Sequence, residues 1–124
     1  MRARRRTGPE RFAFEAAWLV GELADAFAAA PNEIAGVILE PMNVAYPLEG
    51  YLQGLRALCD RYGAVLIFDE VVTGFRSCPG GAQELFDVKA DLGAYGKVVG
   101  GGLPIGVIAG RKKFMDALDG GWWE

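Results

Sequence analysis

Charged residues stand directly after three short apolar segments of the chain. Asp69 and Glu70 follow one segment, Glu40 ends another, and Lys97 comes just after a third. Such segments are typical of strands buried in a parallel sheet, and the carboxyl ends of parallel strands meet at one edge of that sheet. We therefore expect these charged groups to gather in one crevice. The apolar segments are 34–39, 64–68 and 91–95.

Lys97 is the residue in this set that is best suited to covalent chemistry. It follows Gly96 in a stretch of small residues, and desolvation in such a setting favours loss of the ammonium proton. A neutral amine can attack an aldehyde and form an imine. A buried carboxylate such as Asp69 can keep a pyridine nitrogen protonated, as pyridoxal phosphate requires. Each residue alone has an ordinary interpretation, a surface lysine or a strand-end carboxylate, so the prediction depends on the pair.

Two nucleotide-binding alternatives fit the sequence less well. The segment 65–70 has the look of a Walker B strand, which would predict an ATP-binding domain. A P-loop has the pattern GxxxxGK[ST], but Asp91 stands where its first glycine belongs and Val98 follows Lys97 without a hydroxyl. The glycine cluster 100–106 lacks the GxGxxG spacing before a helix, and it predicts a tight turn instead.

The composition excludes several classes of site. Histidine is absent, which rules out a Ser-His-Asp triad, a Cys-His pair and a His-ligated metal within this chain. Cys59 and Cys78 lack CxxC spacing and suit a reducing cytoplasm, and Cys59 lies in a helical pattern where we expect it to pack inertly. The net charge of −3 gives no electrostatic case for a nucleic-acid partner.

The chain begins with a basic run, Met1 to Arg6. We interpret residues 1–14 as a basic, disordered start rather than a nucleic-acid arm or a targeting signal. No apolar segment of the kind found in secretory signals follows the run, and the longest apolar runs are too short to span a bilayer. We therefore expect no membrane partner and a cytoplasmic location.

The pattern of apolar residues predicts an α/β fold with a mostly parallel sheet and flanking helices. Apolar residues at helical spacing fill 15–30 and 50–62, and Gly63 is placed to end the second helix. We find no internal domain boundary. The remaining expected elements are strands at 34–39, 64–68, 91–95 and 105–109, helical turns at 82–86, and a helix at 111–118.

Several sequence blocks, in order and spacing, resemble the class III (fold type I) pyridoxal phosphate aminotransferases. The similarity is to the glutamate-1-semialdehyde 2,1-aminomutase-like branch in particular, and it runs from about Glu33 to Leu118. The loop 42–47 looks more like the related aminotransferases of sugar, lipopeptide or polyketide pathways. The blocks are IAGVILEP (34–41), LCDRYG (58–63), LIFDEVVTGFR (66–76), GGAQ (80–83) and GKVVGGGLPIG (96–106).

The resemblance implies a role for each site residue. Lys97 would form the imine with pyridoxal 5'-phosphate and later move the proton between substrate and cofactor. Asp69 would pair with the pyridinium nitrogen, Val71 would pack behind the ring, and Glu40 would face substrate or cofactor. The reaction implied is amino-group transfer, by a transaminase or a glutamate-1-semialdehyde aminomutase-like enzyme, between a small-molecule amino donor and a carbonyl acceptor. The full-length family implies a homodimer.

The resemblance also implies that the chain is an incomplete piece of the cofactor-binding large domain, which we assign to residues 15–124. The family's phosphate-binding turn and ring-stacking aromatic lie upstream of the matched region, and its C-terminal domain and a threonine donated across the dimer lie downstream. The adjacent tryptophans at 122–123 also favour a truncated end. A non-catalytic remnant or interaction module remains an alternative, and an ATP-binding domain is a less favoured one.

Overall fold

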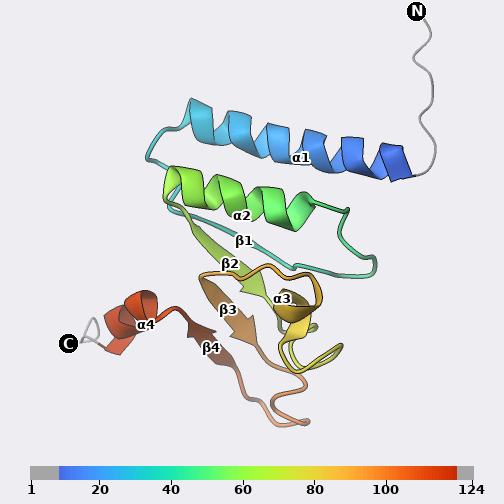
Figure 1. Cartoon of the computed structure of the whole chain (residues 1–124). Coiled ribbons are helices and arrows are strands. Elements are labelled where there is room, and N and C mark those ends of the chain that lie inside the picture. Colours follow the sequence, from blue (N-terminus) through green and yellow to red (C-terminus); the bar gives the residue numbers. More distant parts are fainter. Residues whose placement is uncertain (1–8, 120–124) are drawn as a thin grey trace, which may run out of the picture.

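The computed structural model describes the backbone of residues 9–119 and the side chains of residues 18–117 (Figure 1). The basic run 1–6 and the tryptophan pair 122–123, on which two sequence expectations depend, lie outside the described residues. Among the helices described, none is long and apolar enough to cross a membrane.

The described strands are β1 (Gly36–Leu39), β2 (Val65–Asp69), β3 (Leu92–Tyr95) and β4 (Val107–Gly110). They form one sheet in the order β1-β2-β3-β4. The first three strands are parallel, and β4 pairs with β3 in the antiparallel direction. The predicted α/β fold with a mostly parallel sheet is confirmed.

The described helices are α1 (Pro9–Ala29), α2 (Tyr51–Tyr62), α3 (Gly81–Leu85) and α4 (Lys112–Asp119). All four lie where helical patterns were expected, but α1 begins at Pro9 rather than at residue 15. Residues 9–14 are therefore helical, which corrects that part of the expected disordered start. A proline fits the first turn of a helix because its missing N–H would have no partner there.

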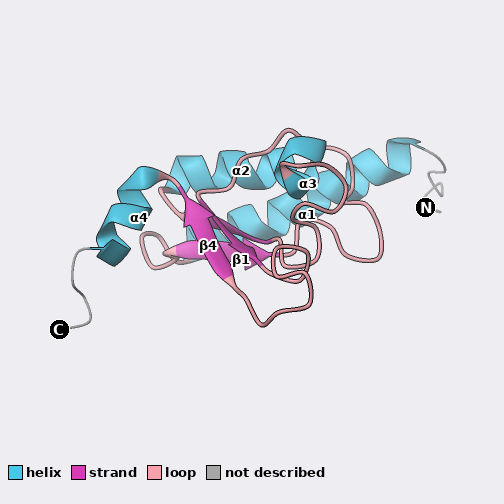
Figure 2. Cartoon of the chain, turned by 90° about the horizontal axis from the view of Figure 1, so that it is seen from below, coloured by secondary structure: helices cyan, strands magenta, loops and turns pink. Residues whose placement is uncertain are grey.

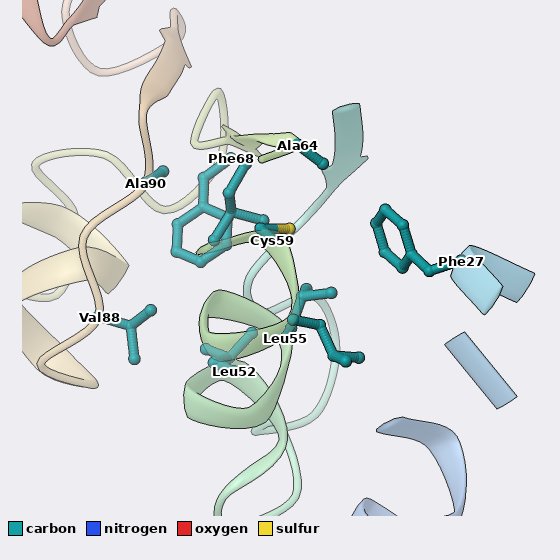
Figure 3. Packing of buried hydrophobic residues seen from close by; sticks show 10 residues of the cluster. Phe27, Leu52, Leu55, Cys59, Ala64, Phe68, Val88 and Ala90 are labelled. Carbon is teal, nitrogen blue, oxygen red and sulfur yellow. The ribbon is translucent and has the colours of Figure 1, made fainter. Parts of the chain in front are cut away.

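The core lies between α2 and one face of the sheet. Leu52, Leu55 and Cys59 of α2 are buried against Leu66 and Phe68 of β2 (Figure 3). The prediction that Cys59 is a packing residue is confirmed. Helix α1 runs along α2 (Figure 1), and its Phe27 joins the same cluster.

The other face of the sheet is open in the described part of the chain. Figure 2 shows α2 and α3 on the same side of the strands. Side chains alternate across a sheet, so Ile38, Ile67 and Ile108 lie on the opposite side, where Ile38 is 67% exposed and Ile108 is 59% exposed. Asp69 belongs to this open face because it lies two residues after Ile67.

Candidate active site

Asp69 and Lys97 lie at the same edge of the sheet. Asp69 is the last residue of β2 and pairs in register with Ala94 of the parallel neighbour β3. The Glu70 N–H donates to the Ala94 carbonyl at 2.8 Å, so the two strands stay joined to their ends. Lys97 follows two residues after β3 ends at Tyr95. The structure thus brings the predicted lysine and aspartate to neighbouring strand ends.

The Asp69 carboxylate is held by the turn that follows its own strand. Its Oδ1 accepts the Val71 N–H at 3.0 Å, which fixes the orientation of the carboxyl group. The half-buried Val71 side chain also lies beside Gly96: a Cβ added at Gly96 would meet Val71 Cγ1 at 3.4 Å. Val71 therefore fills the space between the end of β2 and the residue before Lys97.

Lys97 has a left-handed backbone, with φ of 44°. This region is uncommon for residues other than glycine, asparagine and aspartate. The Lys97 carbonyl accepts the N–H groups of Gly100 and Gly101, each at 3.1 Å, so the lysine opens the predicted glycine turn. The side chain itself is exposed. The expectation that its surroundings would desolvate the amine is wrong for the described residues, because they leave the Lys97 side chain exposed.

Glu40 lies farther along the same edge. It follows β1, and β2 lies between β1 and the strand that leads to Lys97. Its exposed side chain lines a hollow of about 290 Å³, together with Asn43 and Tyr46 of the loop that follows. Glu40 thus shares the sheet edge with Asp69 and Lys97, but neither of those residues lines the hollow beside Glu40.

Glu70 does not join the other charged groups, and the expectation of a shared crevice is wrong for this residue. Its side chain is 0% exposed because the alternation of β2 continues past the strand and turns Glu70 to the helix-covered side with Leu66 and Phe68. Its carboxylate accepts the Thr73 hydroxyl at 2.8 Å and the Ala82 N–H at 2.7 Å. Glu70 therefore ties the start of α3 to the end of β2.

Sequence reasoning also missed a polar pair that joins α3 to the end of β3, Gln83 and Tyr95. The Gln83 Nε2 donates to the Tyr95 hydroxyl at 2.9 Å. Burial raises the pKa of Tyr95, and the nearby charge of Glu70 raises that pKa further, although the hydrogen bond from Gln83 works against them. The apolar run before Glu70 lacks alternation, so it does not indicate that Glu70 is buried, and no local signal joins Gln83 to Tyr95.

A second charged cluster lies at the opposite edge of the sheet, around Asp91. Its carboxylate accepts the Leu66 N–H at 2.9 Å and Arg56 Nη1 at 2.7 Å, and Arg111 Nε lies 3.2 Å away. Burial raises the pKa of Asp91, but these hydrogen bonds and charges outweigh it and hold that pKa below its usual value. A hollow of about 510 Å³ beside Gln83 and Arg111 also lies away from Asp69 and Lys97. The Asp91 cluster links α2, β2 and the segments beside β3 and β4, and it does not form part of the candidate site.

A family profile described as Aminotransferase class-III matches residues 8–122. The chain belongs to the class-III aminotransferase family. The resemblance drawn from the sequence blocks is thereby confirmed. A curated relative, the glutamate-1-semialdehyde 2,1-aminomutase of Alkaliphilus oremlandii (strain OhILAs), is 55% identical over 91 residues. That match covers 70% of this chain and 22% of the relative.

Solved structures of class III transaminases share the fold. The taurine:2-oxoglutarate aminotransferase of Bifidobacterium kashiwanohense, solved in complex with PLP and glutamate, is 32% identical with a TM-score of 0.81. The match covers 94% of this chain and 28% of that one. An omega-transaminase from Sphaerobacter thermophilus is 38% identical with a TM-score of 0.71, over 77% of this chain and 23% of that one. The expected fold type I architecture is confirmed, and the chain spans less than a third of the length of these relatives.

Proposed function

We propose that this chain carries the lysine and aspartate of a pyridoxal 5'-phosphate site that transfers amino groups. The observation that carries the proposal is the placement of Asp69 and Lys97 at adjacent ends of the parallel strands β2 and β3. Membership of the class-III aminotransferase family supports it. The two side chains have the chemistry that the cofactor needs, an acidic partner for a ring nitrogen and a primary amine for an aldehyde.

The residues present fit the ring and the aldehyde of this cofactor. Asp69 would hold the pyridine nitrogen, because its carboxyl orientation is already fixed by the Val71 N–H. The Val71 side chain would lie against the ring, since it stands between Asp69 and the Gly96 backbone. When bound, the cofactor supplies an aldehyde that takes up the amino group and a ring that accepts electrons.

Lys97 would act through its Nζ in two ways. As a primary amine it would bind the cofactor, and once released it would accept and return a proton at the substrate carbon. Because the Lys97 side chain is exposed, its Nζ is accessible to the cofactor and to the substrate. The left-handed backbone of Lys97, braced by Gly100 and Gly101, fixes the direction in which the side chain leaves the strand end.

The finer parts of the proposal concern substrate, assembly and location. We propose a small-molecule amino donor and carbonyl acceptor, handled by a transaminase or a glutamate-1-semialdehyde aminomutase-like enzyme. The identity to the Alkaliphilus aminomutase supports the second reaction.

We also propose a homodimer, supported by exposed apolar side chains beside the site, such as Val98, Leu103 and Ile105. The free cysteines Cys59 and Cys78 support a cytoplasmic location.

Site-specific labelling tests the proposal in the 124-residue chain itself. The chain is incubated with pyridoxal phosphate, reduced with borohydride, digested and mapped by mass spectrometry. Lys89 is the matched internal control, because it is exposed and lies just before β3, whereas Lys97 follows that strand. We expect Lys97 to be labelled about tenfold faster than Lys89, since a positioned amine reacts faster than a free one. Equal labelling of the two lysines would contradict the proposal.

A further inference from the structure

Glu70 is the buried first member of a chain of polar contacts that runs from the end of β2 to the end of β3 through the partly buried Gln83 and Tyr95. Its carboxylate accepts the Thr73 hydroxyl at 2.8 Å, the Ala82 N–H at 2.7 Å and the Gln83 N–H at 3.2 Å. These bonds compensate for burying the carboxylate completely. Gly81 has φ of 66°, and any Cβ there would collide with Glu70 Oε2, so the start of α3 is shaped around this carboxylate.

Gln83 continues the chain from α3 to β3. Its Oε1 accepts the Ala90 N–H at 2.9 Å, and its Nε2 donates to the Tyr95 hydroxyl at 2.9 Å. A backbone N–H only donates, so the amide oxygen must face Ala90 and the amide nitrogen must face Tyr95. The orientation of the Gln83 amide is therefore determined by its partners.

Tyr95 ends this chain of contacts, as the last residue of β3 and two residues before Lys97. Its ring lies against two glycines: a Cβ at Gly74 would meet Tyr95 Cδ1 at 2.6 Å, and a Cβ at Gly93 would meet the Tyr95 hydroxyl at 2.7 Å. The Phe75 ring packs against the Tyr95 ring, with the two ring centroids 5.9 Å apart. Close packing and the hydrogen bond from Gln83 thus leave the tyrosine little freedom.

We propose that Glu70, Gln83 and Tyr95 are positioning residues that fix the Lys97 amine relative to the Asp69 carboxylate. Glu70 is the neighbour of Asp69 in the chain, and Tyr95 stands two residues before Lys97. A displacement of either strand end would strain the hydrogen bonds that link Glu70, Gln83 and Tyr95. This inference rests on the proposed function, because it assigns the network a purpose in placing the cofactor-binding amine.

The test compares Tyr95→Phe and Gln83→Leu with the unchanged 124-residue chain. The Tyr95→Phe change keeps the ring and removes only the hydroxyl, whereas Gln83→Leu removes both bonds of the amide. The readout is the ratio of Lys97 to Lys89 labelling by pyridoxal phosphate and borohydride. We expect the ratio to fall about fivefold to tenfold in both variants, because small displacements of a reacting group cost large factors in rate.

Acetic anhydride, which needs an accessible amine but no second binding group, provides the second readout. Its Lys97 to Lys89 ratio should stay unchanged in both variants, because the amine remains exposed. If both reagents slow by the same factor, the variants have altered the amine itself and the positioning role is refuted. An unchanged pyridoxal phosphate ratio in the variants also refutes it.

Two further variants separate positioning from loss of stability. Gln83→Glu keeps an acceptor for the Ala90 N–H and offers a partner to the Tyr95 hydroxyl, so it should retain the labelling ratio of the unchanged chain. Asp91→Asn lowers stability at the other edge of the sheet and should leave the ratio unaltered. A fall in the ratio with Asp91→Asn equal to that with Gln83→Leu would mean that stability alone controls it, which overturns the inference. If the unchanged chain shows no preference for Lys97, the proposed function fails together with the inference; if it shows one that the variants keep, only the inference fails.

Discussion

Arg56 forms one buried and one exposed ion pair. Comparing the two tests how much each pair contributes to the free energy of unfolding. Its Nη1 lies 2.7 Å from Asp91, and its Nη2 lies 2.7 Å from Asp60. The Asp91 side chain is 4% exposed and the Asp60 side chain is 60% exposed. Because water screens the exposed pair, we expect Asp91→Asn to lower the free energy of unfolding far more than Asp60→Asn does.

The magnitude follows from the partners of Asp91. Leu66 N–H and Arg56 Nη1 donate to the same oxygen of Asp91, and an asparagine oxygen can accept both, so the main loss is the charge that strengthens the bond from Arg56, about 1.5–3 kcal/mol. The Arg111 side chain is 48% exposed. Its pair with Asp91 therefore adds at most about 1 kcal/mol. We expect Asp91→Asn to cost about 1.5–4 kcal/mol and Asp60→Asn about 0.5 kcal/mol.

The same change should alter the response to acid. The pKa of Asp91 is held below its usual value in the folded chain, because hydrogen bonds from Leu66 and Arg56 outweigh the effect of burial. Its stabilisation is therefore complete above about pH 4, the pKa of an unfolded aspartate. That stabilisation is lost as the pH falls through the lower folded pKa, so the difference between the unchanged chain and Asp91→Asn should shrink in acid.

Urea unfolding followed by circular dichroism, at neutral pH and through the acid range, measures both effects. Asp60→Asn serves as the matched control on the same arginine. The reasoning is refuted if the two variants lose equal stability at neutral pH, or if the Asp91→Asn difference stays constant as the pH falls.

Two further predictions concern the packing of Gly74 and the ionisation of Tyr95. Gly74→Ala should lower the free energy of unfolding by about 1–3 kcal/mol, because its Cβ would overlap the Tyr95 ring and the Glu70 carbonyl. Gly21→Ala in α1, where nothing lies within 4 Å, should be neutral or stabilising in the same urea experiment, and equal losses would contradict the packing argument. Burial and Glu70 raise the pKa of Tyr95, so its neutral form stabilises the fold fully below about pH 10, the unfolded value, and this stabilisation is lost as the pH rises through the folded pKa. The Tyr95→Phe variant should therefore lose less stability than the unchanged chain as the pH rises. If the free energies of unfolding of the two chains fall equally with rising pH, this prediction is wrong.

The secondary structure follows from local patterns, which explains why it could be predicted. Each strand is a short apolar run, and α2 ends at Gly63, whose φ of 69° suits glycine. The start of α1 was not predicted because a basic run precedes Pro9 and is typical of a disordered segment, although proline is common in the first turn of a helix. Asp69 and Lys97 could be placed together because both follow parallel strands.

Other features of the site depend on contacts that the sequence does not encode locally. Gln83 and Tyr95 are twelve residues apart, and they meet only because α3 folds back onto β3. The left-handed backbone of Lys97 lacks the asparagine, aspartate or glycine that usually signals this conformation. The exposure of the lysine depends on which face of the sheet the helices cover, and apolar runs without alternation do not identify that face.

The most direct test of the central claim places this segment in a complete enzyme. Residues 8–122, the range that matches the family profile, replace the corresponding segment of a full-length class III aminotransferase, and the rate of amino-group transfer is measured for the chimera and its Lys97→Arg variant. We expect an active chimera whose Lys97→Arg variant is at least about a hundredfold slower, because arginine keeps the charge but cannot bind the aldehyde or move the proton. A Lys97→Arg chimera that transfers amino groups as fast as the parent chimera would show that Lys97 is not the cofactor-binding lysine.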